Sequence, residues 1–366
     1  GDERRTEIAP EAEELEIEDL IAEEDVVITM SHGGYIKRLP ISSYRKQHRG
    51  GRGVAGADIK EEDFIEHLFV ASTHDAILFF TDKGVVHWLK VHEIPEAGRA
   101  SKGKAIINLL AIGAGEKTSA FVPVREYKEG HFLVMATKFG SIKKTDLQAY
   151  ANPRKGGIIG MGLEKDDELI GVEMTSGADE ILLATREGKA IRFKEEQVRD
   201  MGRSAKGVRG IRLGKKDAVI AMQIVRPEQT VLTVTGLGFG KRTLFKEYRL
   251  QSRGGKGIIN IKVTGKNGQA VGLKIVSDKD ELMLVTEKGM VVRCPVKDVR
   301  ATGRSTQGVR LMKIDTHDVV TSMARIVPEE EEVEKEIVAE KPKVEIAVSK
   351  AEKEIAAVKL RKKLPR

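Results

Sequence analysis

A short motif that recurs six times constrains the fold of this chain more than any other feature. The motif is Thr/Ser-x-x-Gly, and successive copies begin 50, 56, 48, 50 and 51 residues apart. Its copies lie at residues 31–34, 81–84, 137–140, 185–188, 235–238 and 286–289. An apolar, β-rich run precedes each copy, and a second run ending in a basic residue follows it. Two short strands around a glycine-containing turn predict a β-hairpin in every repeat.

A second element, a basic loop that ends in glycine, follows each hairpin at a nearly constant distance. Its final glycine lies 19 residues after the hairpin glycine in repeats one, two, four, five and six, at Gly53, Gly103, Gly207, Gly257 and Gly308. In the third repeat we align Gly156, which lies 16 residues after Gly140, and expect a loop three residues shorter. One strand is predicted after the loop and another before the next hairpin, which gives about four strands per repeat.

Six such units predict an all-β fold, a propeller-like ring of four-stranded blades. A ring leaves only short sheet edges exposed, whereas a linear solenoid needs distinct terminal caps, and none is evident in the sequence. At about 150 residues per domain, length alone suggests two or three domains, but the repeats unite residues 26–327 in one. Residues 1–25 are expected to be a linker or the end of a preceding domain, and residues 328–366 a charged, flexible tail.

The charge is distributed unevenly between these three segments. The whole chain has a net charge of +7. Residues 1–25 contain twelve acids and two arginines, and residues 328–366 contain ten charges of each sign. Residues 26–327 therefore hold 51 Lys and Arg against 34 Asp and Glu, a net charge of +17. The predicted ring is strongly basic, which favours a polyanionic partner.

Other features of the sequence exclude several classes of protein. No apolar run approaches the roughly 18–20 residues of a membrane span, and no signal peptide opens the chain. The single cysteine, Cys294, cannot form an intrachain disulfide, and a reducing compartment fits. Because the chain begins with Gly1, we expect it to be a piece of a larger protein.

Motifs that suggest catalysis fit the repeats better than they fit an active site. Residues 98–105 match a phosphate-binding loop for seven positions, but Ala105 stands where a hydroxyl should bind magnesium. The glycines of residues 236–240 coincide with the fifth hairpin turn and lack a surrounding βαβ unit. The histidines show no zinc spacing and the tyrosines no nucleophile context. We expect no catalytic residue, cofactor or metal in this chain.

The recurring basic residues carry the functional prediction. Symmetry places equivalent positions around one rim, so the repeated cations predict a continuous positive band, although a solvated surface is the simpler alternative. Aromatic residues are only 4% of the chain, which argues against stacking on single strands, so we expect duplex DNA bound through its phosphates. The predicted rim cations are Lys37, Arg38, Arg45, Lys46, Arg99, Lys102, Lys104, Lys143, Lys144, Arg154, Lys155, Arg192, Arg203, Lys206, Arg209, Lys241, Arg242, Arg253, Lys256, Arg293, Arg304 and Arg310.

The first basic loop resembles a known motif. Residues 47–53, Gln-His-Arg-Gly-Gly-Arg-Gly, resemble the GyrA-box heptapeptide Gln-Arg-Arg-Gly-Gly-Lys-Gly, and the six repeats resemble the C-terminal domain of bacterial DNA gyrase A, a type IIA topoisomerase. The resemblance implies a six-bladed β-pinwheel, in which neighbouring blades exchange strands, that wraps DNA with positive handedness around its perimeter. It assigns the box to Gln47, His48, Arg49, Gly50, Gly51, Arg52 and Gly53.

The resemblance also implies a cellular setting. The domain, monomeric by itself, would present a transport segment for negative supercoiling in an A2B2 holoenzyme with gyrase B and the N-terminal catalytic region of gyrase A. Residues 1–25 would then end that region. ATP and magnesium would be used elsewhere in this holoenzyme, in the bacterial cytoplasm at the nucleoid, with no role for a membrane.

Three features qualify this resemblance. His48 and Arg52 replace the arginine and lysine usual in the box, and residues 251–257 form a second, similar loop in the fifth repeat. The alternatives are the equivalent domain of topoisomerase IV, which usually lacks an intact box, and a propeller-like protein-interaction module. Residues 329–345, with eight acids against three lysines, are expected to compete with DNA for the rim.

Overall fold

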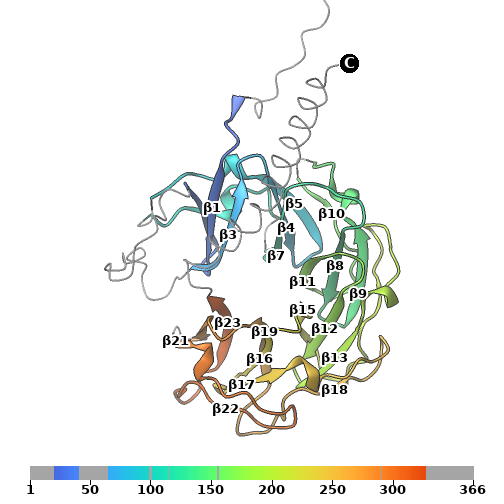
Figure 1. Cartoon of the computed structure of the whole chain (residues 1–366), viewed down its shortest axis with the longest axis vertical. Coiled ribbons are helices and arrows are strands. Elements are labelled where there is room, and N and C mark those ends of the chain that lie inside the picture. The colour runs from blue at the N-terminus through green and yellow to red at the C-terminus, as the bar shows by residue number, and fades with distance from the viewer. Residues whose placement is uncertain are drawn as a thin grey trace, which may run out of the picture.

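The strands of this protein form six sheets that stand as blades around a central space (Figure 1). The computed structural model describes residues 20–40, 65–98, 101–113, 115–154, 156–288 and 290–326. Among these, five sheets have four strands and the sixth has three. The predicted all-β, six-bladed ring is confirmed.

Each blade is built on the predicted hairpin. The hairpins are β1 (Asp25–Ser31) with β2 (Tyr35–Pro40), β4 (Ala76–Thr81) with β5 (Val85–Lys90), β8 (Phe132–Thr137) with β9 (Ser141–Asp146), β12 (Glu180–Thr185) with β13 (Lys189–Lys194), β16 (Thr230–Thr235) with β17 (Phe239–Leu244), and β20 (Glu281–Thr286) with β21 (Val291–Pro295). A third, inner strand borders the central space. The inner strands are β3 (Ile65–Ser72), β7 (Thr118–Val124), β11 (Leu169–Thr175), β15 (Val219–Ile224), β19 (Ala270–Val276) and β23 (Val320–Ile326).

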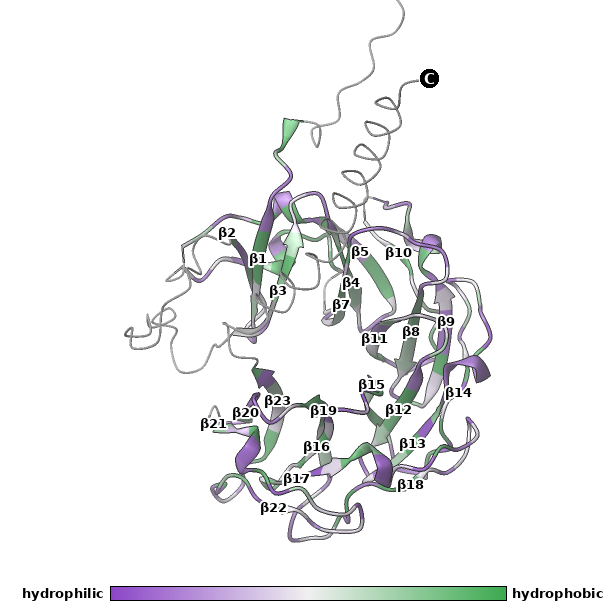
Figure 2. Cartoon of the chain, in the orientation of Figure 1, coloured by the Kyte–Doolittle hydropathy of each residue, from purple (hydrophilic) through white to green (hydrophobic). Residues whose placement is uncertain are grey.

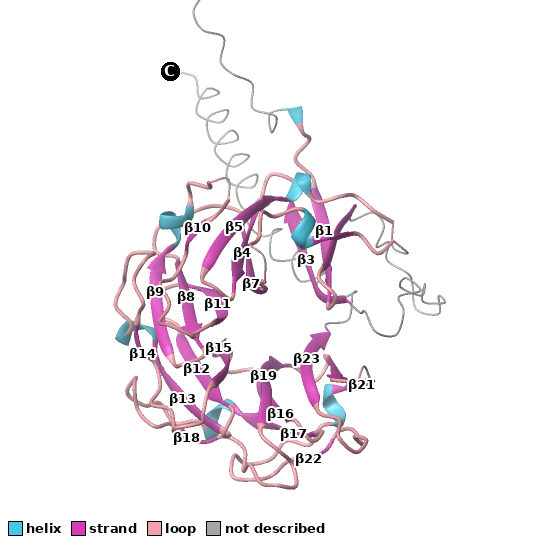
Figure 3. Cartoon of the chain, turned by 180° about the vertical axis from the view of Figure 1, so that it is seen from behind, coloured by secondary structure: helices cyan, strands magenta, loops and turns pink. Residues whose placement is uncertain are grey.

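The outer strand of a blade comes from the next repeat. Five two-residue strands pair with β2, β5, β9, β13 and β17: β6 (Lys104–Ala105), β10 (Ile158–Ile159), β14 (Val208–Arg209), β18 (Ile258–Ile259) and β22 (Val309–Arg310). This exchange confirms the implied pinwheel. All the described helices are short 3-10 segments in the connections between strands (Figure 3).

The threonine and glycine of the repeated motif each have a defined role in the turn. At the second hairpin, Gly84 N donates to Thr81 O at 2.9 Å, and the Thr81 hydroxyl accepts a hydrogen bond from Val85 N at 3.3 Å. Gly84 has φ +74°, and a Cβ there would lie 2.4 Å from Met161 O. Glycine is therefore required both by the positive φ and by the close approach of the neighbouring chain segment.

One sequence alignment was wrong by a residue. In the third repeat Ile158 pairs with Val86, so the glycine before the outer strand is Gly157 rather than Gly156, and it lies 17 residues after Gly140. Gly157 has φ +83°, and a Cβ on it would lie 2.9 Å from Val86 O. This tight contact with β5 identifies Gly157 as the equivalent glycine. The sequence could not decide between Gly156 and Gly157, because the two glycines are adjacent.

The core lies between blades rather than at the centre of the ring. Ile28 and Ile36 of the first blade pack with Phe79 of the second, and Phe80 of the second packs with Leu133 of the third. Alternate residues of one strand therefore serve two different interfaces, as expected where both faces of a sheet are covered. Hydrophobic residues accordingly concentrate on the strands and hydrophilic ones in the connections (Figure 2).

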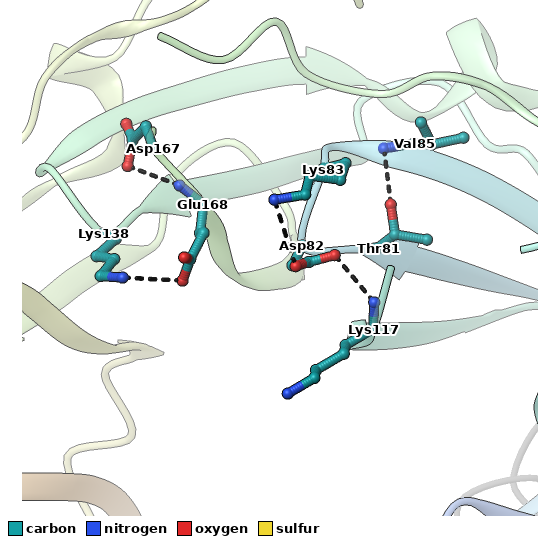
Figure 4. A network of polar contacts seen from close by, with 8 residues as sticks. All are labelled: Thr81, Asp82, Lys83, Val85, Lys117, Lys138, Asp167 and Glu168. Carbon is teal, nitrogen blue, oxygen red and sulfur yellow. Dashed lines mark hydrogen bonds and ion pairs between the residues drawn. The ribbon is translucent and has the colours of Figure 1, made fainter. Parts of the chain in front are cut away.

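Polar contacts join each hairpin turn to the inner strand of its own blade (Figure 4), and a backbone bond from the same turn reaches the next blade. Asp82 N donates to Lys117 O at 2.8 Å, and the Asp82 carboxylate accepts from Lys117 N at 3.0 Å, within the second blade. Leu169 N, on the inner strand of the third blade, donates to Asp82 O at 2.9 Å. The equivalent turn of the third blade carries an ion pair between Lys138 and Glu168 at 3.1 Å. The bond from Leu169 to Asp82 therefore joins the second blade to the third, and the other contacts hold each turn within its own blade.

Candidate nucleic-acid interface

Four of the predicted rim lysines, Lys37, Lys143, Lys144 and Lys241, are buried, and three of them bind the basic loop of the following repeat. Lys143, on β9, is fully buried, and its Nζ donates to Gly160 O and Arg203 O, both at 2.5 Å. Lys241, on β17, occupies the same place two repeats later and donates to Gly303 O and Arg304 O at 2.7 Å. Both side chains therefore donate hydrogen bonds to backbone carbonyls of the basic loop in the following repeat. The expectation that they lie on the surface is wrong.

Lys37, on β2, is the third member of this set. It is 5% exposed, and its Nζ donates to Gly98 O at 3.2 Å and to Ser101 O at 2.7 Å. The second repeat has His87 at the equivalent position, also buried, and burial lowers the pKa of its imidazole. The residue at this strand position faces the basic loop of the following repeat and is buried in both repeats, whether it is a lysine or a histidine.

Burial changes the proton affinity of two of these amines. Loss of water around the charged form lowers the pKa of Lys143 to about 7, with a smaller contribution from the nearby Arg203 guanidinium. Burial likewise lowers the pKa of Lys241 to about 7, helped by Arg304. Since a lysine in water has a pKa near 10.4, both groups favour the neutral form far more than a surface lysine does.

The next residue of the second strand anchors a different part of the following repeat. Arg38 Nε donates to Ile94 O at 2.8 Å, Arg192 Nη1 to Phe245 O and Tyr248 O at 3.1 Å, and Arg242 Nε to Val299 O at 2.6 Å. Lys144 pairs with Asp200 at 3.2 Å, and Arg293 pairs with Glu281. These five predicted rim cations are engaged with the protein itself.

Trp88 takes the same place in the second repeat, which reasoning from charge could not reveal. Its indole Nε1 donates to Tyr150 O at 2.9 Å, as the arginines do elsewhere. The shared requirement is a donor that reaches a loop carbonyl, and charge is incidental to it. Aligning the six repeats by position would have placed Trp88 with the arginines and identified it as a candidate donor.

The cations of the glycine-ended loops and outer strands form the accessible set. Lys104, Arg154, Lys206, Arg209, Lys256 and Arg310 are exposed, whereas Arg203, Arg253 and Arg304 are half-buried. Lys102 is exposed and its Nζ lies 4.0 Å from the centroid of the Tyr35 ring. All lie at the perimeter, because they precede or belong to the outermost strands. Arg212, also exposed, was missed, since it follows the loop rather than lying in it.

Some predicted residues fall outside the described ranges. These are the box residues Gln47, His48, Arg49, Gly50, Gly51, Arg52 and Gly53, together with Arg45, Lys46, Arg99 and Lys155. Residues 1–19 and 327–366, which include most of the predicted linker and the tail, also lie outside them. The assignments of these residues stay predictions.

The second box-like loop, residues 251–257, is fully described. Arg253 Nε donates to Gln197 O at 2.9 Å, and Arg253 Nη1 donates to Arg209 O at 2.6 Å. Gly254 N donates to Gly210 O at 2.8 Å, and Arg212 N donates to Gly255 O at 2.8 Å. The loop is therefore fixed to η6 (Glu195–Gln197), to β14 and to the residues that follow β14, with Lys256 exposed on it.

Loop arginines link consecutive positions along the perimeter. Arg304 Nη1 donates to Ile259 O at 2.8 Å, the counterpart of the bond from Arg253 to Arg209 O. In each case the guanidinium reaches the last residue of the outer strand from the preceding repeat. Arg154 and Arg203, from the third and fourth repeats, line one cavity of about 480 Å³. These loop arginines therefore connect the perimeter positions of consecutive repeats.

Within the described residues, the side chains that could bind a metal are dispersed, and two phenols and the thiol favour their neutral forms. No three His, Cys, Asp or Glu side chains within those ranges are grouped so that they could hold a metal ion. Burial raises the pKa of the Tyr150 and Tyr248 phenols, and it raises the pKa of the Cys294 thiol. These shifts oppose the ionised, nucleophilic forms. No helix within the described part of the chain is long and apolar enough to cross a membrane.

Comparison with known proteins agrees with this architecture. The family model for the DNA gyrase C-terminal domain, beta-propeller, matches residues 25–72, 75–125, 131–176, 179–226, 229–277 and 280–326. The DNA gyrase A protein of Halalkalibacterium halodurans is 55% identical over 92% of this chain, and that of Escherichia coli K12 is 46% identical over 91%. The chain spans about two fifths of each of these relatives, 40% and 38%.

Solved structures show the same fold. A crystal structure of the C-terminal domain of DNA topoisomerase IV aligns with a TM-score of 0.76 and 27% identity, over 87% of this chain and 98% of that one. A DNA gyrase A C-terminal domain aligns with a TM-score of 0.63 and 24% identity, over 83% of this chain and all of the other. Since the family model covers all six repeats, the chain belongs to the DNA gyrase C-terminal domain, beta-propeller family.

Proposed function

We propose that the perimeter of the ring binds duplex DNA through its phosphates, largely independently of sequence. The observation that carries the proposal is the ordered series of exposed loop and outer-strand cations, among them Lys206, Arg209 and Lys256, on consecutive repeats. Backbone N–H groups in glycine-containing loops can approach phosphates closely. A duplex that follows a ring must bend, which costs about 1–6 kcal/mol over 20–30 base pairs, and many phosphate contacts can offset this cost.

The family supports a more specific role. We propose that residues 26–327 wrap DNA with positive handedness and so supply the transport segment for ATP-dependent negative supercoiling. In this proposal the chain is part of the gyrase A protein in a bacterial, cytoplasmic A2B2 holoenzyme with gyrase B, and the catalytic region of gyrase A precedes residue 26. ATP and magnesium act elsewhere in that assembly.

Ligation of nicked circular DNA tests the wrapping proposal. The purified chain is bound to the circle, the nick is sealed, and the linking number is measured after the protein is removed. We expect a positive shift that grows with the amount of protein. Replacing residues 47–53 by alanines should abolish the shift and leave most of the binding, because the other loop cations remain. If the original chain leaves the linking number unchanged or lowers it, the wrapping proposal is wrong.

A second candidate is DNA binding and bending without topological wrapping, as part of a topoisomerase IV. The TM-score of 0.76 with the C-terminal domain of DNA topoisomerase IV favours it. The same ligation experiment separates the two, since this candidate predicts salt-sensitive binding with no linking-number shift.

A further inference from the structure

In two of the outermost strands the last residue is a large exposed apolar one, whereas the last residue of the others is not. Ile159, the last residue of β10, is 56% exposed, and Ile259, the last residue of β18, is 48% exposed. The equivalent residues of β14 and β22 are Arg209 and Arg310. Along these four strands, exposed isoleucine alternates with exposed arginine.

The geometry of the outer strands directs these isoleucines away from the blades. Ile158 packs against the core between the second and third blades, and Ile258 packs against the core of the fourth and fifth blades. Successive side chains of a strand point to opposite sides, so Ile159 and Ile259 face outward. Neither belongs to a core cluster of the described residues. Packing within the ring therefore does not account for them.

Both isoleucines lie directly beside arginines of the basic loops. Ile159 lines the cavity of about 480 Å³ together with Arg154 and Arg203. Ile259 accepts a hydrogen bond at its carbonyl oxygen from Arg304 Nη1, at 2.8 Å. An apolar partner surface alone does not fit this setting, because it would have to cover the neighbouring guanidinium groups. A partner that offers phosphates beside an apolar interior, as duplex DNA does, fits both components.

We propose that Ile159 and Ile259 press between base pairs of the bound duplex and kink it at the perimeter. This inference rests on the proposed DNA binding of the rim. Apolar wedges of this kind partly unstack one base step and bend the duplex, while adjacent cations hold the phosphates on either side. Pyrimidine–purine steps unstack most easily, so the wedges add a preference for TA and CA steps to a contact that otherwise ignores sequence.

The test uses the 366-residue chain and duplexes that carry 2-aminopurine at a TA step, with a donor and an acceptor dye at the two ends. For the original chain we expect increased 2-aminopurine fluorescence and increased energy transfer on binding. The double variant Ile159→Ala/Ile259→Ala should lose most of the fluorescence increase and bind about three- to tenfold more weakly, from the loss of apolar contact. Its salt dependence should stay unchanged, because no phosphate contact is removed.

Ile107→Ala is the matched control. Ile107 lies in η4 (Ile106–Asn108), is 68% exposed and faces the cavity at the centre of the ring rather than the perimeter. This variant should behave as the original chain does in both assays.

Three other outcomes overturn the inference. Equal unstacking and bending by the double variant and the original chain would show that the isoleucines do not act as wedges. A double variant that alters only self-association, measured by sedimentation, would assign them to a protein contact. If the original chain shows no salt-dependent DNA binding, the proposed function fails first, and this result is distinct from the other two.

Discussion

The second strands and the glycine-ended loops of this protein carry similar cations in opposite environments. Lys143 is fully buried on a strand and gives its hydrogen bonds to loop carbonyls, whereas Lys206, in the loop above it, is exposed and pairs with Glu164 at 3.1 Å. The two residues contribute equally to the formal net charge of the chain. They differ in what their removal leaves behind, because loss of Lys143 leaves a loop carbonyl without its donor and loss of Lys206 leaves the exposed Glu164 carboxylate to water.

The first prediction removes the buried member of this pair. Lys143→Met keeps an unbranched chain of similar length but leaves the carbonyl oxygen of Arg203 without the Lys143 donor, whereas the carbonyl oxygen of Gly160 still accepts from the Tyr150 hydroxyl at 3.0 Å. We expect a loss of about 1–3 kcal/mol in the free energy of unfolding, the cost of one unsatisfied acceptor. Urea denaturation measures the change. A variant as stable as the original chain would show that these bonds contribute nothing net.

The second prediction concerns pH. The pKa of Lys143 and of Lys241 is about 7 in the folded chain, well below the unfolded value, so between pH 7 and about 10 the unfolded state binds more protons. The free energy of unfolding should therefore rise with pH in this window, by up to about 1.4 kcal/mol per pH unit for each lysine. The difference between the original chain and Lys143→Met/Lys241→Met isolates this contribution. Parallel curves for the two proteins would contradict the lowered pKa values.

The third prediction removes exposed charge. Lys206→Gln/Lys256→Gln should change the free energy of unfolding by no more than about 0.5 kcal/mol, because both side chains are exposed. If both lysines contact phosphates, the slope of log K against log salt should become shallower by about 0.9 for each. DNA titrations at several salt concentrations measure it. A slope equal to that of the original chain would place these lysines outside the interface.

Comparison of the repeats explains how far the sequence could predict this structure. The spacing of Thr81 and Gly84 and of their equivalents predicts the hairpins, because a turn with a positive φ and a hydroxyl acceptor depends on residues close in sequence. The same regularity predicts the loops, apart from the choice between Gly156 and Gly157. That choice depended on Val86, which lies far from both in sequence and directly below Gly157 in space.

The environment of each cation could not be predicted in the same way. Lys143 and Lys206 differ in exposure because β9 receives its outer strand from the following repeat, which encloses one and leaves the other at the edge. The order of charged residues in the sequence does not depend on which strand pairs with β9. The pairing of strands from different repeats decides which cations are buried. The pattern of residue types along the chain does not show this pairing directly.

The number of blades, the position of each hairpin and the excess of positive charge in residues 26–327 thus follow from the sequence alone, since local turn chemistry and composition suffice for these. Three-dimensional packing was needed to show which cations remain accessible, which serve as internal donors to the next loop, and where Ile159 and Ile259 stand among the arginines. The cause is the exchange of outer strands between repeats, because it converts some surface positions of one blade into buried contacts with the next.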